Sequence, residues 1–179
     1  ELRLVRDALV VVTQDAGVHL LDFGIAKAIA EGEASETELT QMGGRALTLD
    51  YASPEQIAGL PIGTASDVYS LGVLFYELLT GGRPYQPKRD SRGAREEAIL
   101  SAEAKKPSQA IEEAEPAQAR TSTPKKLAHL LAGDLDTIAL KALKKNRAER
   151  YATADAFAQD LERYRAGLPV LAQPESRWY

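Results

Sequence analysis

The clearest pattern of hydrophobic positions along the chain lies in residues 67–80. Large apolar side chains recur there at intervals of three and four, which is the spacing of one helix: Leu71, Leu74, Phe75, Leu78 and Leu79. Thr64 and Ser66 are candidate N-terminal caps, and Gly81-Gly82 would end the helix. Because apolar residues fall on nearly every face, we expect this helix at the centre of the core.

Shorter patterns lie on either side of this helix. Residues 8–13 and 18–22 are apolar or β-branched runs separated by a polar turn, which predicts a β-hairpin. Apolar residues at helical spacing predict two further helices, in residues 134–143 and 154–165. The predicted fold class is α+β, mainly α: a helical bundle around a buried central helix, plus a small β-hairpin.

Three stretches have few large apolar residues. Residues 26–47 are polar and contain several glycines, so we expect a loop. Residues 88–124 are rich in Ala, Glu, Lys, Arg and Pro, and we expect them to be loose apart from a short helix near 94–100. Residues 167–179 contain Pro169 and Pro174 and predict an extended tail.

Composition narrows the class of protein. The 179 residues are 44% hydrophobic and 27% charged, as in an ordinary soluble globular domain. The net charge is −4 with scattered basic residues, so we expect no nucleic-acid binding. The longest apolar stretch is too short and too polar for a membrane segment, and we expect a cytoplasmic protein. The absence of cysteine excludes disulfides and thiolate metal sites.

Four sequence blocks carry the chemical signal. They read LLDFGIAK (20–27), DYASPEQ (50–56), DVYSLGVLFYELLTG (67–81) and DLDTIALKAL (134–143). A single tripeptide such as Asp22-Phe23-Gly24 is weak evidence, but four blocks in one order are strong. In that order and spacing the chain resembles the C-terminal lobe of bacterial-type serine/threonine protein kinases. The resemblance implies a partial kinase domain over residues 1–166, with the N-terminal lobe absent.

The resemblance implies roles for the residues around the phosphoryl-transfer site. Asp22 matches the aspartate that binds the magnesium ion bridging the nucleotide phosphates. Phe23 would pack beneath the site, and Gly24 would allow the backbone to reverse. Thr48 matches the threonine of the substrate pocket, which favours serine and threonine substrates over tyrosine. The implied cofactors are ATP and magnesium.

Other matched residues have structural or regulatory roles in the family. Glu55 and Arg150 match a buried ion pair that joins the activation segment to the lower helices. Asp67 matches the residue that holds the backbone of the catalytic loop, although it would also serve as a plain helix cap. The activation segment contains three candidate phosphorylation sites: Ser35, Thr37 and Thr40.

The sequence departs from the family at the catalytic loop. An ungapped alignment places Leu4 where kinases have the catalytic aspartate, and leucine cannot accept a hydroxyl proton. A gapped alignment places Asp7 there but deletes the lysine and asparagine that follow; the alternative for Asp7 is a solvated loop residue. The sequence also contains no glycine-rich loop and no V-A-I-K lysine.

These departures leave three hypotheses. The chain is a fragment of a serine/threonine kinase that is inactive alone, and that acts on protein substrates in its complete form. Alternatively, it is a pseudokinase-like module that binds partner proteins without catalysis. A third alternative is a decayed gene product.

Overall fold

The computed structural model describes residues 10–12, 18–20, 49–87, 89–111 and 123–172. The chain divides into two compact units, residues 1–48 and 49–179, and each is described by itself. In the first unit, strands β1 (Val10–Val12) and β2 (Val18–Leu20) pair antiparallel, with Val11 opposite His19. The predicted turn between them lies outside the described residues, so the hairpin stays a prediction.

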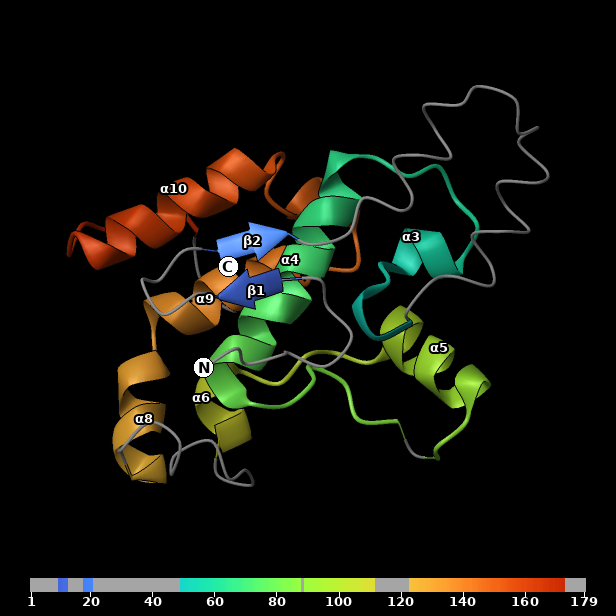
Figure 1. Cartoon of the computed structure of the whole chain (residues 1–179), viewed down its shortest axis with the longest axis horizontal. Coiled ribbons are helices and arrows are strands. Elements are labelled where there is room, and N and C mark those ends of the chain that lie inside the picture. The colour runs from blue at the N-terminus through green and yellow to red at the C-terminus, as the bar shows by residue number, and fades with distance from the viewer. Residues whose placement is uncertain (1–9, 13–17, 21–48, 88, 112–122, 173–179) are drawn as a thin grey trace, which may run out of the picture. The chain divides into compact units, whose positions relative to one another are not determined.

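The second unit is helical, which confirms the mainly helical fold. Its elements are η1 (Leu49–Tyr51), α3 (Pro54–Ile57), α4 (Thr64–Thr80), α5 (Arg92–Ser101), α6 (Pro107–Ala110), α8 (Pro124–Leu131), α9 (Asp134–Ala142), η3 (Arg147–Glu149) and α10 (Ala154–Arg165). Helix α4 lies between α8, α9 and α10 on one side and α3 and α5 on the other (Figure 1). The predicted helix at 154–165 and the central place of α4 agree with the structure.

Helix α4 ends at the predicted glycine, but its N-terminal cap differs from the prediction. Gly63 is the N-cap, and the Ser66 hydroxyl accepts a hydrogen bond from the Gly63 N–H at 3.4 Å. Thr64 is not the cap, because its hydroxyl donates instead to the Ala152 carbonyl at 3.1 Å. Gly81 ends the helix in the left-handed conformation with φ of 76°, which a residue with a β carbon adopts only with strain.

The predicted stripe of α4 is only partly covered: Phe75 and Leu79 pack against the core, but the most deeply buried side chains lie on other positions of the helix. Val68, Tyr69 and Val73 are buried, whereas Leu71 and Leu78 are 38% and 46% exposed. The buried face combines two large side chains, Tyr69 and Tyr76, with Gly72, where α9 packs closely. Helical spacing alone predicts which residues share a face, but not which of several apolar faces is covered.

Helices α4 and α9 pack closely at Gly72. A β carbon placed on Gly72 would lie 2.7 Å from the β carbon of Ala142 and 3.3 Å from its carbonyl carbon. Both contacted atoms belong to a packed helix and cannot rotate away. A side chain at Gly72 would therefore force the two helices apart.

We expect Gly72→Ala to lower the free energy of unfolding by about 1–2 kcal/mol. Overpacking costs about 1–3 kcal/mol, and the better helix propensity of alanine offsets about 1 kcal/mol of that. Urea denaturation followed by circular dichroism measures the change. Gly93→Ala in α5 is the matched control, because nothing lies within 4 Å of a β carbon there. If both variants were equally stabilised, the close packing of α4 on α9 would be contradicted.

The segment expected to be loose contributes to the core. Helix α6 and the following Ile111 pack against α8 and α9, and Ile111 is fully buried with Leu127 and Leu131. The Asp136 carboxylate accepts hydrogen bonds from the Ser108 N–H at 2.9 Å and the Ser108 hydroxyl at 2.6 Å. The average composition of residues 88–124 did not predict α6, because this segment has few apolar residues of its own. Its apolar contacts are with residues of α8 and α9.

The first part of the predicted tail also packs on the helical unit. Asp160, which is fully buried in α10, accepts hydrogen bonds from the Leu171 and Ala172 N–H groups at 2.6 and 2.8 Å. The Tyr151 hydroxyl donates to the same carboxylate at 2.9 Å. Ala172 is 3% exposed and lies in the core cluster with Phe157. The chain is therefore anchored as far as residue 172.

Candidate functional site

The candidate site is built on η1 and α3, which directly follow Thr48. Ser53 caps α3, because its hydroxyl accepts from the Gln56 N–H at 3.4 Å while the Gln56 side chain accepts from the Ser53 N–H at 2.8 Å. Pro54 occupies the first turn, where it has no N–H to leave unpaired. This short helix begins with fixed geometry despite having only four residues.

A buried ion pair fastens α3 to the rest of the unit. The two terminal nitrogens of Arg150 donate to the two carboxylate oxygens of Glu55 at 2.7 and 2.8 Å. The side chains of Arg150 and Glu55 are 0% and 2% exposed. The structure thus brings together the two residues that the sequence analysis paired across 95 positions.

All five N–H donors of Arg150 are used. Besides the two bonds to Glu55, the guanidinium donates to the carbonyls of Ala65, Lys144 and Lys145 at 2.8, 2.6 and 3.1 Å. A buried arginine needs this complete set of partners, because each unpaired donor would be costly in the interior. The guanidinium therefore links α3, the start of α4 and the segment after α9.

The Glu55 carboxylate is held in its charged form. Burial opposes ionisation, but the hydrogen bonds from Arg150 and from the Ser66 hydroxyl, which lies 2.6 Å away, outweigh it. Together they lower the pKa of Glu55 to about 2. The Glu55 carboxylate is therefore ionised at neutral and mildly acidic pH.

A second polar group holds η1 against α4. The Tyr51 hydroxyl donates to Glu77 at 2.9 Å, and the Arg83 guanidinium lies 4.3 Å from the centre of the Tyr51 ring. Arg83 also pairs with Asp50 at 3.3 Å. Burial and the hydrogen bond to Glu77 raise the pKa of Tyr51 to about 12. Because these groups are partly exposed, their contribution is to position η1 more than to stabilise the fold.

Lys145 is a half-buried amine next to this region. Its ammonium nitrogen lies 3.7 Å from the centre of the Tyr85 ring and donates to the Ile99 carbonyl at 2.5 Å. Burial, with the nearby charge of Arg150 as the second cause, lowers the pKa of Lys145 from 10.5 to about 8. Its charged form is therefore less favourable in the folded protein than in the unfolded chain.

We expect the free energy of unfolding to rise as the pH increases from 8 to 10. Since the folded-state pKa of Lys145 is the lower one, the unfolded chain binds more protons in this range, and stability rises with pH. Above pH 10 tyrosines such as Tyr51 and Tyr85 lose their protons in the unfolded chain before they do so in the folded protein. The free energy of unfolding then falls with further increase in pH. Urea denaturation across the range measures the slope. Lys145→Met should remove the rise and exposed Lys125→Met should keep it; an unchanged slope in Lys145→Met would contradict the assignment.

Most of the other predicted site residues lie outside the described residues. They are Leu4, Asp7, Asp22, Phe23, Gly24, Ser35, Thr37, Thr40 and Thr48. Asp67 is described: it lies in the first turn of α4 and is exposed, without a hydrogen bond to another described side chain. Its predicted role toward the catalytic loop stays a prediction.

Sequence reasoning missed some of the groups that build the site. Ser66 was considered only as a helix cap, yet it also donates to Glu55. No sequence signal links Lys145 to Tyr85 or Tyr51 to Glu77, because these contacts depend on how α4, α5 and α9 pack. Within the described ranges, no cluster of three or more potential metal ligands is found. Nor does any helix there have the length and apolar character needed to cross a bilayer.

Comparison with known families decides what this helical unit is. The family described as "Protein kinase domain" matches residues 6–161, which is most of the chain. The chain belongs to the protein kinase family. The resemblance drawn from the four sequence blocks is confirmed, and kinases as a family use ATP and magnesium and act on proteins.

Curated relatives place the chain near bacterial serine/threonine kinases. It is 36% identical to the serine/threonine-protein kinase PknB of Mycobacterium tuberculosis over 171 residues, which are 93% of this chain and 23% of the relative. A probable PknB of Bifidobacterium longum is 34% identical and covers 95% of this chain. A probable serine/threonine-protein kinase of Corynebacterium efficiens is 32% identical and covers 89%. The chain spans less than a quarter of the length of these relatives.

Proposed function

We propose that the helical unit is the substrate-holding part of a serine/threonine protein kinase, and that this chain does not transfer phosphate by itself. The observation that carries the proposal is the buried Glu55–Arg150 ion pair, which fixes α3, the helix that follows η1 in the sequence. A substrate hydroxyl must be held in one orientation for transfer, so the surface that holds it must be rigid.

The geometry of η1 supports a platform for a peptide. Its three residues, Leu49–Tyr51, are held by the hydrogen bond from Tyr51 to Glu77 and by the ion pair between Asp50 and Arg83. The Ser70 hydroxyl adds a third contact, because it donates to the Tyr51 carbonyl at 2.8 Å. In the kinase resemblance, Thr48, the residue that precedes η1 in the sequence, favours an alcohol of serine or threonine.

The proposed inability to transfer phosphate rests on residues that the sequence does not contain. Phosphoryl transfer depends almost entirely on positioning and electrostatic stabilisation of the phosphates. The 179 residues contain no glycine-rich loop and no V-A-I-K lysine to provide this, and Leu4 stands at the ungapped position of the catalytic aspartate. Asp22 remains the proposed magnesium ligand; binding ATP would need further groups.

Peptide titration followed by NMR tests the substrate-holding role. The isotope-labelled chain is titrated with a serine-containing peptide and, separately, with the same peptide carrying tyrosine. We expect the serine peptide to shift the amide signals of Leu49–Tyr51, and Tyr51→Phe, which releases the bond to Glu77, to weaken the effect. Exposed Glu162→Gln is the control. Shifts confined to other helices, or none, would contradict the role.

A second candidate function is a non-catalytic module that binds partner proteins, and the leucine at position 4 favours it. A fusion distinguishes the two. In it, the nucleotide-binding lobe and an intact His-Arg-Asp loop of a bacterial relative precede residue 10. Transfer of phosphate to a serine peptide by the fusion supports the kinase role. A folded fusion that binds ATP but transfers nothing supports the non-catalytic module.

A further inference from the structure

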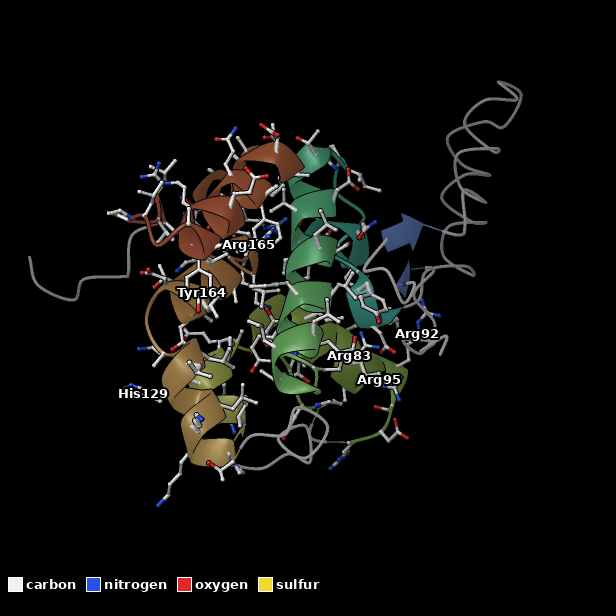
Figure 2. The ribbon with its side chains drawn as sticks, turned by 60° about the vertical axis from the view of Figure 1, so that its left-hand side comes forward. Arg83, Arg92, Arg95, His129, Tyr164 and Arg165 are labelled. Carbon is white, nitrogen blue, oxygen red and sulfur yellow. The ribbon has the colours of Figure 1, made fainter. Side chains whose placement is uncertain are left out.

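A tight turn at the end of α4 sets the direction of Arg83. Gly81 ends the helix in the left-handed conformation, and the buried Thr80 hydroxyl accepts a hydrogen bond from the Gly82 N–H at 3.2 Å. The Arg83 side chain then lies beside the last turns of α4, where one of its terminal nitrogens is 3.6 Å from the Glu77 carboxylate. Figure 2 shows Arg83 at this end of α4.

The Arg83 guanidinium is held by three residues. One terminal nitrogen donates to the Asp50 carbonyl at 3.2 Å, and the other donates to the Asp50 carboxylate at 3.3 Å. The Glu77 carboxylate lies near the first nitrogen, and the centre of the Tyr51 ring is 4.3 Å from the guanidinium carbon. We call Asp50, Tyr51 and Glu77 the cradle. Forked donors on oxygen atoms, with an aromatic ring against the plane, suit a guanidinium better than a compact ammonium.

The charges around the cradle favour a cation as its ligand. Asp50 and Glu77 contribute two carboxylates, whereas Arg83 contributes one positive charge. The next guanidinium, that of Arg95, is 3.9 Å from Asp50 but also pairs with Asp90. With three carboxylates and two guanidinium groups, these five side chains leave one negative charge unbalanced. Arg83 therefore does not exhaust the attraction of the cradle for positive charge.

The cradle is open to solvent and belongs to the proposed platform. Asp50 and Tyr51 are residues of η1, and the side chains of Asp50 and Arg83 are 34% and 27% exposed. A guanidinium from outside the chain can therefore reach this place. Arg83 is attached next to it, however, and a group attached in this way competes as if it were present at about millimolar concentration or more.

We propose that the cradle is a guanidinium-binding site which Arg83 fills, and that Arg83 thereby prevents the platform from selecting peptides by an arginine side chain. The second half of this inference rests on the proposed function, because it takes the excluded ligand to be a substrate peptide. The first half rests only on the contacts of Arg83. The substrate class that follows is a serine or threonine peptide without an arginine that binds at η1.

Small probes test the cradle without any peptide. Ethylguanidinium, ethylammonium and the neutral ethylurea are titrated into the full chain and into Arg83→Ala, and the amide signals of Leu49–Tyr51 are followed by NMR. Ethylguanidinium should bind to Arg83→Ala with a Kd of about 10 mM, as suits so few atoms, and should not shift these signals in the unchanged chain. Ethylammonium should bind more weakly. No binding of ethylguanidinium to Arg83→Ala, or equal binding of ethylurea, would overturn the proposal.

Two further variants make this result specific. Arg83→Ala should fold, because partly exposed ion pairs contribute little to stability, and Arg83→Gln replaces it if it does not. Arg92→Ala is the matched control: it removes an exposed arginine that pairs with Glu96 on α5. Ethylguanidinium should leave Leu49–Tyr51 unshifted in Arg92→Ala. A shift there as large as in Arg83→Ala would overturn the assignment of the site to Arg83.

Paired peptides test the exclusion of arginine. Serine peptides are compared in which one position at a time holds either arginine or leucine. We expect the unchanged chain to bind both members of each pair equally, and Arg83→Ala to bind one arginine peptide about fivefold more tightly. An equal arginine preference in both proteins, or none in Arg83→Ala, would overturn the exclusion. If no serine peptide shifts Leu49–Tyr51 in either protein, the substrate-holding role fails, and the ethylguanidinium result still decides the cradle.

Discussion

Arg150→Met is expected to lower the free energy of unfolding by about 3–5 kcal/mol. The variant removes both bonds to Glu55 and leaves that carboxylate buried with the Ser66 hydroxyl as its remaining side-chain partner. It also releases three backbone carbonyls that the guanidinium satisfies. Chemical denaturation followed by circular dichroism measures the loss.

Two controls make this result specific to the ion pair. Arg165→Met removes an exposed arginine from α10 and should change stability by less than about 0.5 kcal/mol. The double variant Glu55→Leu/Arg150→Met should cost less than the sum of the single changes, because no uncompensated charge remains. Additive costs would mean that Glu55 and Arg150 do not act as a pair.

The same pair predicts a pH dependence in acid. The folded-state pKa of Glu55 is about 2, below its ordinary value of 4.5, so its contribution to stability is present above pH 4.5. That contribution is lost as the pH falls from 4.5 toward 2, where the folded protein must also take up the proton. In Glu55→Gln this part of the acid destabilisation should be missing.

Asp160→Ala is the second large expected effect, a loss of about 2–4 kcal/mol. Asp160 is a fully buried carboxylate that accepts from Tyr151, Leu171 and Ala172. Each unpaired buried partner costs about 1–3 kcal/mol, and release of residues 171–172 to water offsets part of the total. Hydrogen exchange should therefore speed up at the Leu171 and Ala172 amides.

Glu162→Ala in the same helix is the control for this variant. Glu162 is exposed, so its removal should change stability by less than about 0.5 kcal/mol and leave the exchange at Leu171 and Ala172 unchanged. If Asp160→Ala lost stability while those two amides stayed protected, Asp160 would act within α10 and not as the anchor of residues 167–172.

The helices with long uninterrupted patterns were predictable from the sequence. The central helix has apolar residues over four turns and a glycine at its end, and α10 has caps and an amphipathic face of its own. Such helices carry their signal within one segment. Helix α6 does not, because Ile111 is covered by Leu127 and Leu131 from α8. Its burial is decided by residues elsewhere in the chain.

The choice of buried face on α4 has a similar cause. Leu71 and Leu78 fit a helical stripe as well as Val68 and Tyr69 do, and hydrophobicity ranks the leucines no lower. Gly72 packs closely on Ala142 of α9, so α9 covers the part of α4 that contains Gly72. A single sequence does not reveal which glycine marks a close approach.

In the candidate site, only the residues that match motifs of the kinase family could be predicted from the sequence. Glu55 and Arg150 are 95 residues apart, and neither periodicity nor composition connects them. The four blocks in order made the pairing predictable. Ser66, Tyr69 and Lys145 surround that pair and were not predicted to do so, because their roles arise from the packing of α4 against η1 and the segment after α9.

The most direct test of the account is a transfer assay with the 179-residue chain alone. The chain is incubated with magnesium and ATP labelled at the γ-phosphate, together with a serine- and threonine-containing peptide. The account predicts no label on the peptide above a blank without protein, since under the proposal the chain provides a substrate platform but not the groups that hold the triphosphate. Labelled serine or threonine that disappears in Asp22→Ala would contradict it.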